Sequence, residues 1–372
     1  MRLRELGISV GHGAPGPANA ITDVPGVRVG HETIIRGDGK LEVGKGPVRT
    51  GVTVILPHEG NVWAEAVFAG CHRLNGNGEL TGLEWIRESG MLASPIALTN
   101  THSVGVVRDA LIADEIATRG SDAVYWGLPV VGETFDGLLN DINGFHVGPA
   151  HVAAAMRSAS TGPVLEGGVG GGTGMTCHGF KGGIGTSSRV LASEQGGYVV
   201  GVLVQANHGR RPRLLLNGVP VGEEIGPSVV PVPESPAQAM PAGSGSIIVI
   251  IATNAPLLPQ QCSRLAQRAG LGIGRTGGMG EHTSGDMFLA FATGNRGISA
   301  ADAGTDLPLT MDIKMLINTH INPFFEAVID ATEEAIWNAL IAAETIVGRD
   351  GITAYGFPNE RLRDIMAAYR RA

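Results

Sequence analysis

The apolar positions of the chain form short runs that are separated by glycine- and proline-rich segments. One run follows Ser246 and consists of five β-branched residues, Ile247 to Ile251. Such residues favour a pleated backbone, and an unbroken apolar run is typical of a strand that is buried on both faces. A second run, Tyr198 to Ala206, has the same character and ends at Asn207. We expect both runs to be core strands.

Weaker signals for strands and helices occupy the rest of the chain. Strand-like runs occur at 27–31, 51–57, 61–71, 95–102, 129–137 and 281–292. Capping patterns predict one helix capped by Thr81 and another capped by Ser103, and periodicity predicts helices over 259–269 and 323–347. The last of these is a long amphipathic helix with a structural role. No internal repeat or linker is evident, so residues 1–372 are expected to form a single catalytic domain.

The segment before Ser246 is unsuited to a helix or a central strand. Five prolines lie between 227 and 241, and Gly243-Ser244-Gly245 leads directly into Ser246. This composition predicts an exposed connector. Cleavage between Gly245 and Ser246 would free an α-amine, which titrates near neutral pH and can accept the proton of the Ser246 hydroxyl. The alternative is a loop that enters a core strand, with Ser246 only capping it. Spacing alone favours that alternative, because Gly-Ser before a strand is common.

Other candidate site residues lie near the expected ends of strands. The Asn207 amide is placed to donate to an oxyanion, although an asparagine that ends a strand in a turn explains the position equally well. Ser284 and Asp286 have period-two spacing, so both side chains would leave one face of a strand and could polarise a nucleophile or an amine. Glu133, close to Phe135, could hold a substrate ammonium group. Sequence alone favours a solvated loop acid at Glu133.

Two further segments have both a functional and a structural explanation. Asn100, Thr101 and His102 lie between an expected strand and helix, where they are site groups or only turn and cap residues. The glycine-rich segment 166–175 matches neither G-x-G-x-x-G nor the phosphate-binding pattern that ends in Gly-Lys. We therefore exclude nucleotide binding there and expect close packing of backbones.

Composition narrows the functional classes. The chain has 57 glycines among 372 residues and a net charge of −8, which argues against a nucleic-acid partner. The three cysteines form no CxxC pattern, and the eleven histidines are dispersed, so neither a metal site nor a cofactor is expected unless folding brings distant ligands together. The N-terminus lacks a signal-like apolar core, and no span of membrane length occurs, which predicts a cytoplasmic protein without a membrane partner.

The segment 245–259, Gly-Ser-Ile-Ile-Val-Ile-Ile-Ala-Thr-Asn-Ala-Pro-Leu-Leu-Pro, resembles the DmpA/BapA-type aminopeptidases. This family includes the D-aminopeptidases and the β-peptidyl aminopeptidases. Segments 21–31, 74–78, 100–105 and 170–175 are also similar to the family, in the same order, so the resemblance covers nearly the whole chain. Several long motifs in order are far more specific than any one of them.

The resemblance implies an α+β fold, a four-layer αββα sandwich of the N-terminal-nucleophile type with the topology shared by DmpA and the ornithine acetyltransferases. It implies autoproteolysis at Gly245-Ser246 into an α chain, 1–245, and a β chain, 246–372. It also implies a homo-oligomer, expected to be a tetramer of αβ heterodimers.

The resemblance also assigns roles to individual residues. Ser246 matches the nucleophile, Asn207 the oxyanion donor, and Ser284 with Asp286 the pair that accompanies the nucleophile. Glu133 matches a carboxylate that anchors the substrate amino group. Phe135 falls where one branch of the family has a tyrosine that assists the oxyanion, so a backbone N–H is expected to be the second donor in this chain.

The resulting hypothesis is a self-processing serine aminopeptidase. It would release N-terminal small, D- or β-amino acids from peptides, amides and esters through an acyl-enzyme on Ser246. One alternative is an amino-acid acyltransferase, in which an amine replaces water as the acceptor. Another is an unprocessed, non-enzymatic assembly or ligand-binding protein. The partition of the acyl group between water and an added amino acid tests the first alternative, and the absence of a cleaved chain would support the second.

Overall fold

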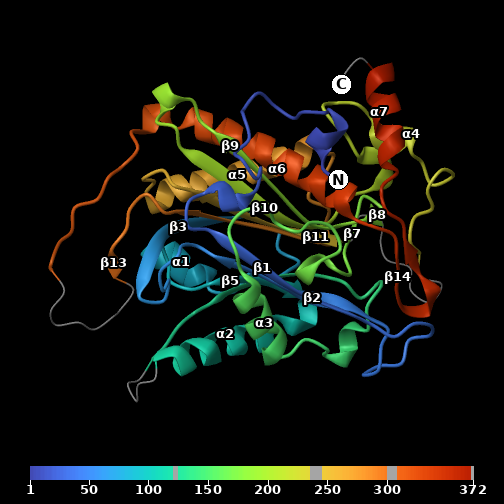
Figure 1. Ribbon diagram of the computed structural model, residues 1–372, viewed down its shortest axis with the longest axis horizontal. Helices are drawn as coiled ribbons and strands as arrows, with labels where there is room; N and C mark the ends of the chain where they lie inside the picture. The colour runs from blue at the N-terminus through green and yellow to red at the C-terminus, as the bar shows by residue number, and fades with distance from the viewer. Residues whose placement is uncertain (120–124, 235–244, 300–307, 370–372) are drawn as a thin grey trace.

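The computed structural model of the chain describes residues 1–119, 125–234, 245–299 and 308–369. Within these residues, two β-sheets lie face to face, and helices cover the outer face of each sheet (Figure 1). The layers therefore follow the order helix, sheet, sheet, helix. This confirms the expected αββα sandwich.

The larger sheet carries the two strands with the strongest sequence signals at its centre. Its strands lie in the order β13 (Ile298–Ser299), β3 (Glu65–Arg73), β12 (Ser284–Ala292), β11 (Gly245–Thr253), β10 (Val199–Asn207) and β9 (Gly183–Val190), and β4 (Met91–Leu92) pairs with β3. The pair β11–β12 is parallel, and β10–β11 is antiparallel.

The smaller sheet has four strands, in the order β1 (Arg28–Arg36), β2 (Val48–Leu56), β5 (Ile96–Asn100) and β6 (Val130–Thr134). Two short two-stranded sheets pair β7 (Thr176–Cys177) with β8 (Phe180–Lys181) and β14 (Ile346–Val347) with β15 (Thr353–Ala354).

Helices α5 (Pro259–Arg275) and α6 (Asn322–Ala342) pack on the larger sheet, and α2 (Val104–Arg119) and α3 (Pro149–Ser158) pack on the smaller one (Figure 1). The shorter α-helices are α1 (Leu83–Ser89), α4 (Val221–Glu224) and α7 (Asn359–Ala368). Single 3₁₀ turns occur at Leu3–Leu6, Ile21–Asp23, Thr101–Ser103, Ile142–Gly144, Gly170–Gly172, Ser193–Gln195, Arg211–Arg213, Asn318–His320 and Arg349–Gly351.

The side chains of β11 alternate between two hydrophobic cores. Ile247, Val249 and Ile251 join the core under α5 and α6, whereas Ile248 and Ile250 join the core between the two sheets. Because successive strand residues point to opposite faces, a strand with cores on both sides needs an unbroken apolar run. The prediction of a strand buried on both faces is confirmed.

The glycine-rich segment lies between the sheets. A Cβ on Gly171 would lie 2.6 Å from the carbonyl oxygen of Leu98 in β5, and one on Gly172 would lie 2.5 Å from the amide nitrogen of Ile184 in β9. Only glycine permits so close an approach of three backbones. The expectation of close backbone packing is confirmed.

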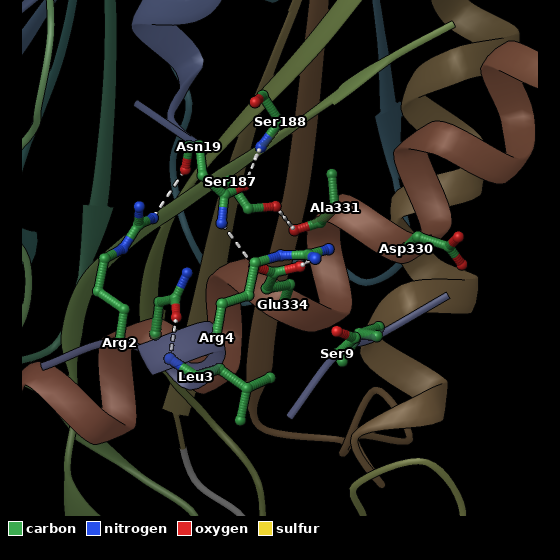
Figure 2. Close-up of polar contacts among 12 residues, drawn as sticks. Arg2, Leu3, Arg4, Ser9, Asn19, Ser187, Ser188, Asp330, Ala331 and Glu334 are labelled. Carbon is green, nitrogen blue, oxygen red and sulfur yellow. Dashed lines mark hydrogen bonds and ion pairs between the residues drawn. The ribbon is translucent and has the colours of Figure 1, made fainter. Parts of the chain in front are cut away.

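Helix α6 differs in two ways from the amphipathic helix predicted over 323–347. It ends at Ala342 rather than Val347, and most of its residues, charged ones included, are buried. Glu334 is fully buried and bonds Arg4 at 2.8 Å (Figure 2). It also bonds Arg189 at 2.7 Å. The N-terminal segment and β9 cover the face that a surface helix would expose, and they supply the cations that a buried carboxylate requires.

Two predicted helix caps are wrong. The Thr81 hydroxyl donates to the carbonyl of Pro129 at 2.7 Å, so it links to the segment before β6 rather than capping α1, which starts after Gly82. At α2, Ser103 is preceded by a turn in which the side chain of Asn100 accepts from the Ser103 amide at 3.0 Å. Asn100, not Ser103, is therefore the capping side chain. The part of the predicted connector at 235–244 lies outside the described residues.

Candidate active site

Ser246 stands at the start of β11, with Asn207 opposite it on β10 and Gly285 opposite it on β12. Its side chain is buried but reaches a pocket of about 550 Å³ between the two sheets. The pocket is lined by Asn77, Gly78, Glu79, Thr101, Glu133, Phe135, Leu138, Thr176, Asn207, Gly245, Ser246 and Thr283. The fold thus brings together residues that are far apart in the chain.

The Ser246 hydroxyl makes two contacts that matter for its chemistry. It accepts a hydrogen bond from the Gly285 amide at 3.1 Å and donates one to the carbonyl oxygen of Gly245 at 2.8 Å. The second contact places the hydroxyl beside the peptide bond that the sequence predicts to be cut. Since β11 is buried on both faces, the hydroxyl is mounted on a rigid element.

Asn207 is held by two hydrogen bonds that settle the orientation of its amide. Its Oδ1 accepts from the Thr176 amide at 2.8 Å, and its Nδ2 donates to the carbonyl of Phe135 at 3.0 Å. An amide nitrogen has two N–H groups, so one remains for an oxyanion. This geometry fits a preorganised donor, whose value comes from being oriented before the charge develops.

Ser284 and Asp286 are paired on β12, as their spacing predicts. The Ser284 hydroxyl donates to Asp286 Oδ1 at 2.6 Å, and both side chains are buried. Burial raises the pKa of Asp286 to about 6, although hydrogen bonds from Ser284, from the backbone of Ile247 and from Asn75 oppose the rise. Neither side chain lines the pocket, because strand alternation directs them to the face opposite the Ser246 side chain. They are thus placed to act on the backbone beside Ser246.

Glu133 reaches the pocket from the opposite sheet. It is the penultimate residue of β6 and its side chain is buried. Its carboxylate accepts from the Glu79 amide at 2.9 Å and accepts a short hydrogen bond from the Thr101 hydroxyl. Burial raises the pKa of Glu133, and these hydrogen bonds oppose the rise. A buried carboxylate that still faces a pocket attracts a cation strongly, because little water screens its charge. The sequence-based preference for a solvated loop acid is wrong, because the two sheets bury Glu133.

The neighbours of Glu133 have separate roles. Phe135 lines the pocket and holds Asn207 through its backbone carbonyl. Asp136 is fully buried, accepts from the Asn140 amide at 3.0 Å, and is absent from the pocket lining. Burial raises the pKa of Asp136 to about 7. Asp136 therefore has a structural role.

Sequence reasoning missed several residues that build the pocket. The Asn75 side chain accepts from the Asp286 amide at 2.6 Å, and Asn77 donates from its side chain to the Thr283 carbonyl at 2.7 Å. In the sequence this loop carried two signals, a pair of Asn-Gly steps that indicates turns and the similarity of 74–78 to the family, and neither assigned a role to Asn75 or Asn77. Of the three candidate residues Asn100, Thr101 and His102, only Thr101 lines the pocket, whereas the His102 ring stacks on Phe145.

Comparison with known proteins identifies the family. Residues 19–354 match the model of peptidase family S58. The chain is 48% identical over 376 residues to the beta-peptidyl aminopeptidase BapA of Sphingosinicella microcystinivorans. The matched region covers all of this chain and 93% of that protein. This chain belongs to peptidase family S58.

Solved structures of similar proteins agree with this assignment. A beta-aminopeptidase of a Burkholderia species is 55% identical, with a TM-score of 0.91 over 99% of each chain. The L-aminopeptidase D-Ala-esterase/amidase of Ochrobactrum anthropi is 42% identical, with a TM-score of 0.88 over 100% of this chain and 99% of that one. That structure is described as a prototype for the serine aminopeptidases and a variant of the Ntn hydrolase fold. The fold and the hydrolase class predicted from the sequence are confirmed.

In the described part of the chain, no helix is both long and apolar enough to cross a membrane.

Proposed function

We propose that this protein is a self-processing serine aminopeptidase that acts through an acyl-enzyme on Ser246. The observation that carries the proposal is the position of the Ser246 hydroxyl, 2.8 Å from the carbonyl oxygen of Gly245 and directly opposite Asn207. A serine that contacts the preceding carbonyl at the mouth of a rigid strand can first cut its own chain and then serve as an N-terminal nucleophile.

In the processing step, Ser246 Oγ attacks the carbonyl carbon of Gly245, and the bond from that carbon to the Ser246 nitrogen breaks. The hydroxyl proton passes to the departing nitrogen, which leaves an ester between Gly245 and Oγ. Water then hydrolyses the ester. The products are the α chain, 1–245, with a new carboxylate, and the β chain, 246–372, with a free α-amine on Ser246.

In turnover, the Ser246 α-amine accepts the hydroxyl proton while Oγ attacks the carbonyl of the substrate's first residue. The free N–H of Asn207 stabilises the oxyanion, a role worth about 3–4 kcal/mol in other enzymes. The leaving amine takes the proton from the α-amine, and water then hydrolyses the acyl-enzyme. Ser284 and Asp286 lie beside the backbone next to Ser246, where they orient the amine.

Glu133 binds the substrate ammonium group across the pocket from Ser246. Phe135 and Leu138 line this pocket of about 550 Å³ and give it an apolar wall for the side chain of the substrate's first residue. The related proteins are named for β-peptidyl and for D-Ala substrates. We therefore assign small N-terminal β- or D-amino acids as the substrate class, released from peptides, amides or esters.

Exposed apolar side chains support the proposal of a homo-oligomer, a tetramer of αβ heterodimers. Between 309 and 317, every second residue is apolar and exposed, namely Leu309, Met311, Ile313, Met315 and Ile317. An extended segment with this pattern is suited to packing against another chain. Light scattering on the purified protein would measure the number of copies.

The decisive experiment is the intact mass of the purified, denatured protein with and without Ser246→Ala. The wild type is expected to give two fragments that meet at Gly245 and Ser246, and the variant a single full-length mass without turnover. Ser263→Ala is the control, since it removes a serine hydroxyl on α5, outside the pocket, and should leave cleavage and turnover unchanged. An uncleaved wild type that still turns over substrate would contradict the mechanism.

A further inference from the structure

A cluster of potential metal ligands lies directly behind Asn207. Cys177, His178 and His208 are all buried, and each offers a ligand atom that lies within 4.8 Å of the other two. The dispersed histidines gave no metal pattern in the sequence, because His208 is separated from the Cys-His pair by the hairpin of β9 and β10. The antiparallel fold of that hairpin brings the ligands together.

The hydrogen bonds of the cluster leave metal-binding atoms without partners. His178 Nδ1 lies 3.0 Å from the carbonyl of Arg210, so Nδ1 carries the proton and Nε2 keeps its lone pair. His178 Nε2 and His208 Nε2 are both buried without a hydrogen-bond partner. An unpaired buried polar atom is unfavourable, and a bound metal would give His178 Nε2 a partner.

The geometry of the cluster suits a zinc ion. In a tetrahedral zinc site, the bond to sulfur is about 2.3 Å and the bond to nitrogen about 2.0 Å, so a sulfur ligand and a nitrogen ligand lie about 3.6 Å apart. Cys177 Sγ and His208 Nδ1 are 3.8 Å apart. The contact from His178 Nδ1 to a carbonyl is the outer contact that orients a ligating imidazole.

We propose that Cys177, His178 and His208 bind one zinc ion. The ligands are Cys177 Sγ, His178 Nε2 and His208 Nδ1. Because the thiolate is the form that binds a metal, binding the ion displaces the Cys177 thiol proton to the solvent. The resulting thiolate offsets one of the two positive charges of the ion. This offset is needed because the Arg211 guanidinium, which donates to the His178 carbonyl at 2.9 Å, places another positive charge nearby.

The ion would fix the position of the oxyanion donor. The Thr176 amide donates to Asn207 Oδ1, and a proposed ligand follows each of these two residues in the chain. Cys177 follows Thr176, and His208 follows Asn207. The His178 amide also donates to the His208 carbonyl at 2.7 Å. A metal that ties these segments together would hold the Asn207 amide in place. Its role is positioning, because its ligands touch neither substrate nor Ser246.

The test measures metal directly, on full-length protein purified without a metal-binding tag. We expect about one zinc per chain by mass spectrometry, retained on dialysis, as for a site with a thiolate and two imidazoles. After removal with a chelator, titration with Co²⁺ should produce the absorption of a cobalt–thiolate bond. Cys177→Ser should lose that absorption and most of the zinc.

Matched variants and the wild-type titration keep the test decisive if Cys177→Ser folds poorly. Cys262→Ser is the control, because it removes another buried thiol, whose contact is the carbonyl of Phe68, and it should leave zinc content unchanged. His208→Phe provides a second route to the same loss. The proposal is overturned if the wild type contains no stoichiometric metal and the metal-free form gives no cobalt–thiolate absorption. Self-cleavage is measured separately by intact mass, so failure of either proposal is recognised independently.

Discussion

Asp286 shows how burial sets the chemistry of a single residue. Its pKa in the folded chain is about 6, against an ordinary value of 3.8, because the carboxyl is buried. The folded chain therefore holds a proton that the unfolded chain loses. The stabilisation from this difference is complete below pH 3.8 and is lost as pH rises through 6.

Asp286→Asn tests this residue, because asparagine cannot ionise. Between pH 4 and pH 7, the free energy of unfolding of the variant should rise relative to the wild type by about 3 kcal/mol, the equivalent of the shift from 3.8 to 6. Turnover should fall, since the amine of Ser246 loses its charged neighbour. Urea denaturation at a series of pH values provides the measurement. Parallel curves for the two proteins would mean that Asp286 ionises normally.

Glu133 is the residue that should determine recognition of the substrate amino group. Glu133→Gln keeps the hydrogen-bond acceptor but removes the charge, and a hydrogen bond to a charged group is worth about 1.5–3 kcal/mol. We expect KM to rise by about 10- to 100-fold, with a smaller change in kcat. Glu79→Gln is the control, since Glu79 lines the same pocket but is exposed. A larger effect at Glu79 would indicate that the substrate ammonium group binds to Glu79 and not to Glu133.

At the scale of elements, the site depends on close contact between β12 and the loop that contains Asn77. A Cβ added to Gly285 would lie 2.5 Å from the carbonyl oxygen of Asn77 and 2.8 Å from Cα of Gly78. Both are backbone atoms, so a side chain at Gly285 must displace the loop or the strand. The same glycine donates its amide to Ser246 Oγ.

Gly285→Ala should therefore cost about 1–3 kcal/mol of stability and slow self-cleavage. Gly105→Ala is the matched control in α2, where an added Cβ meets nothing within 4 Å. That variant should gain about 0.4–1 kcal/mol, because alanine loses less entropy than glycine on folding into a helix. Thermal unfolding and the time course of fragment formation measure the two effects. Normal cleavage in Gly285→Ala would show that the loop moves freely.

For the whole molecule, the proposed cleavage divides the chain without separating its parts. Strands β11 and β12 follow residue 245, but they pair with β10 and β3, which precede it. Glu334 of α6 likewise bonds Arg4 (Figure 2) and Arg189, which both precede the cleavage point. The two fragments should remain together until the protein is denatured.

Glu334→Gln tests the ionic part of this association. It leaves the buried Arg189 guanidinium without a counter-charge, and breaking a buried ion pair in this way costs about 3–5 kcal/mol. Urea unfolding is the measurement, and Glu326→Gln, an exposed position on the same helix, is the control that should change little. A loss of under about 1 kcal/mol would indicate that Arg189 is neutralised by another group.

The sequence by itself determined the features that depend on local periodicity and on motifs. The five β-branched residues after Ser246 predicted a strand buried on both faces, because alternation alone sends its side chains into two cores. The spacing of Ser284 and Asp286 predicted that they share a face, since the period of a strand is two residues. The ordered motifs also indicated the family.

Only the tertiary structure decided which distant residues meet. The register of β11 with its two neighbours places Ser246 against Asn207 and Gly285, and the second sheet brings Glu133 across the pocket. Packing of the N-terminal segment buried the polar face of α6, and the β9–β10 hairpin assembled Cys177 with His208. Each of these contacts joins residues far apart in the chain, and periodicity carries no information about such pairings, because they are set by strand register and layer packing.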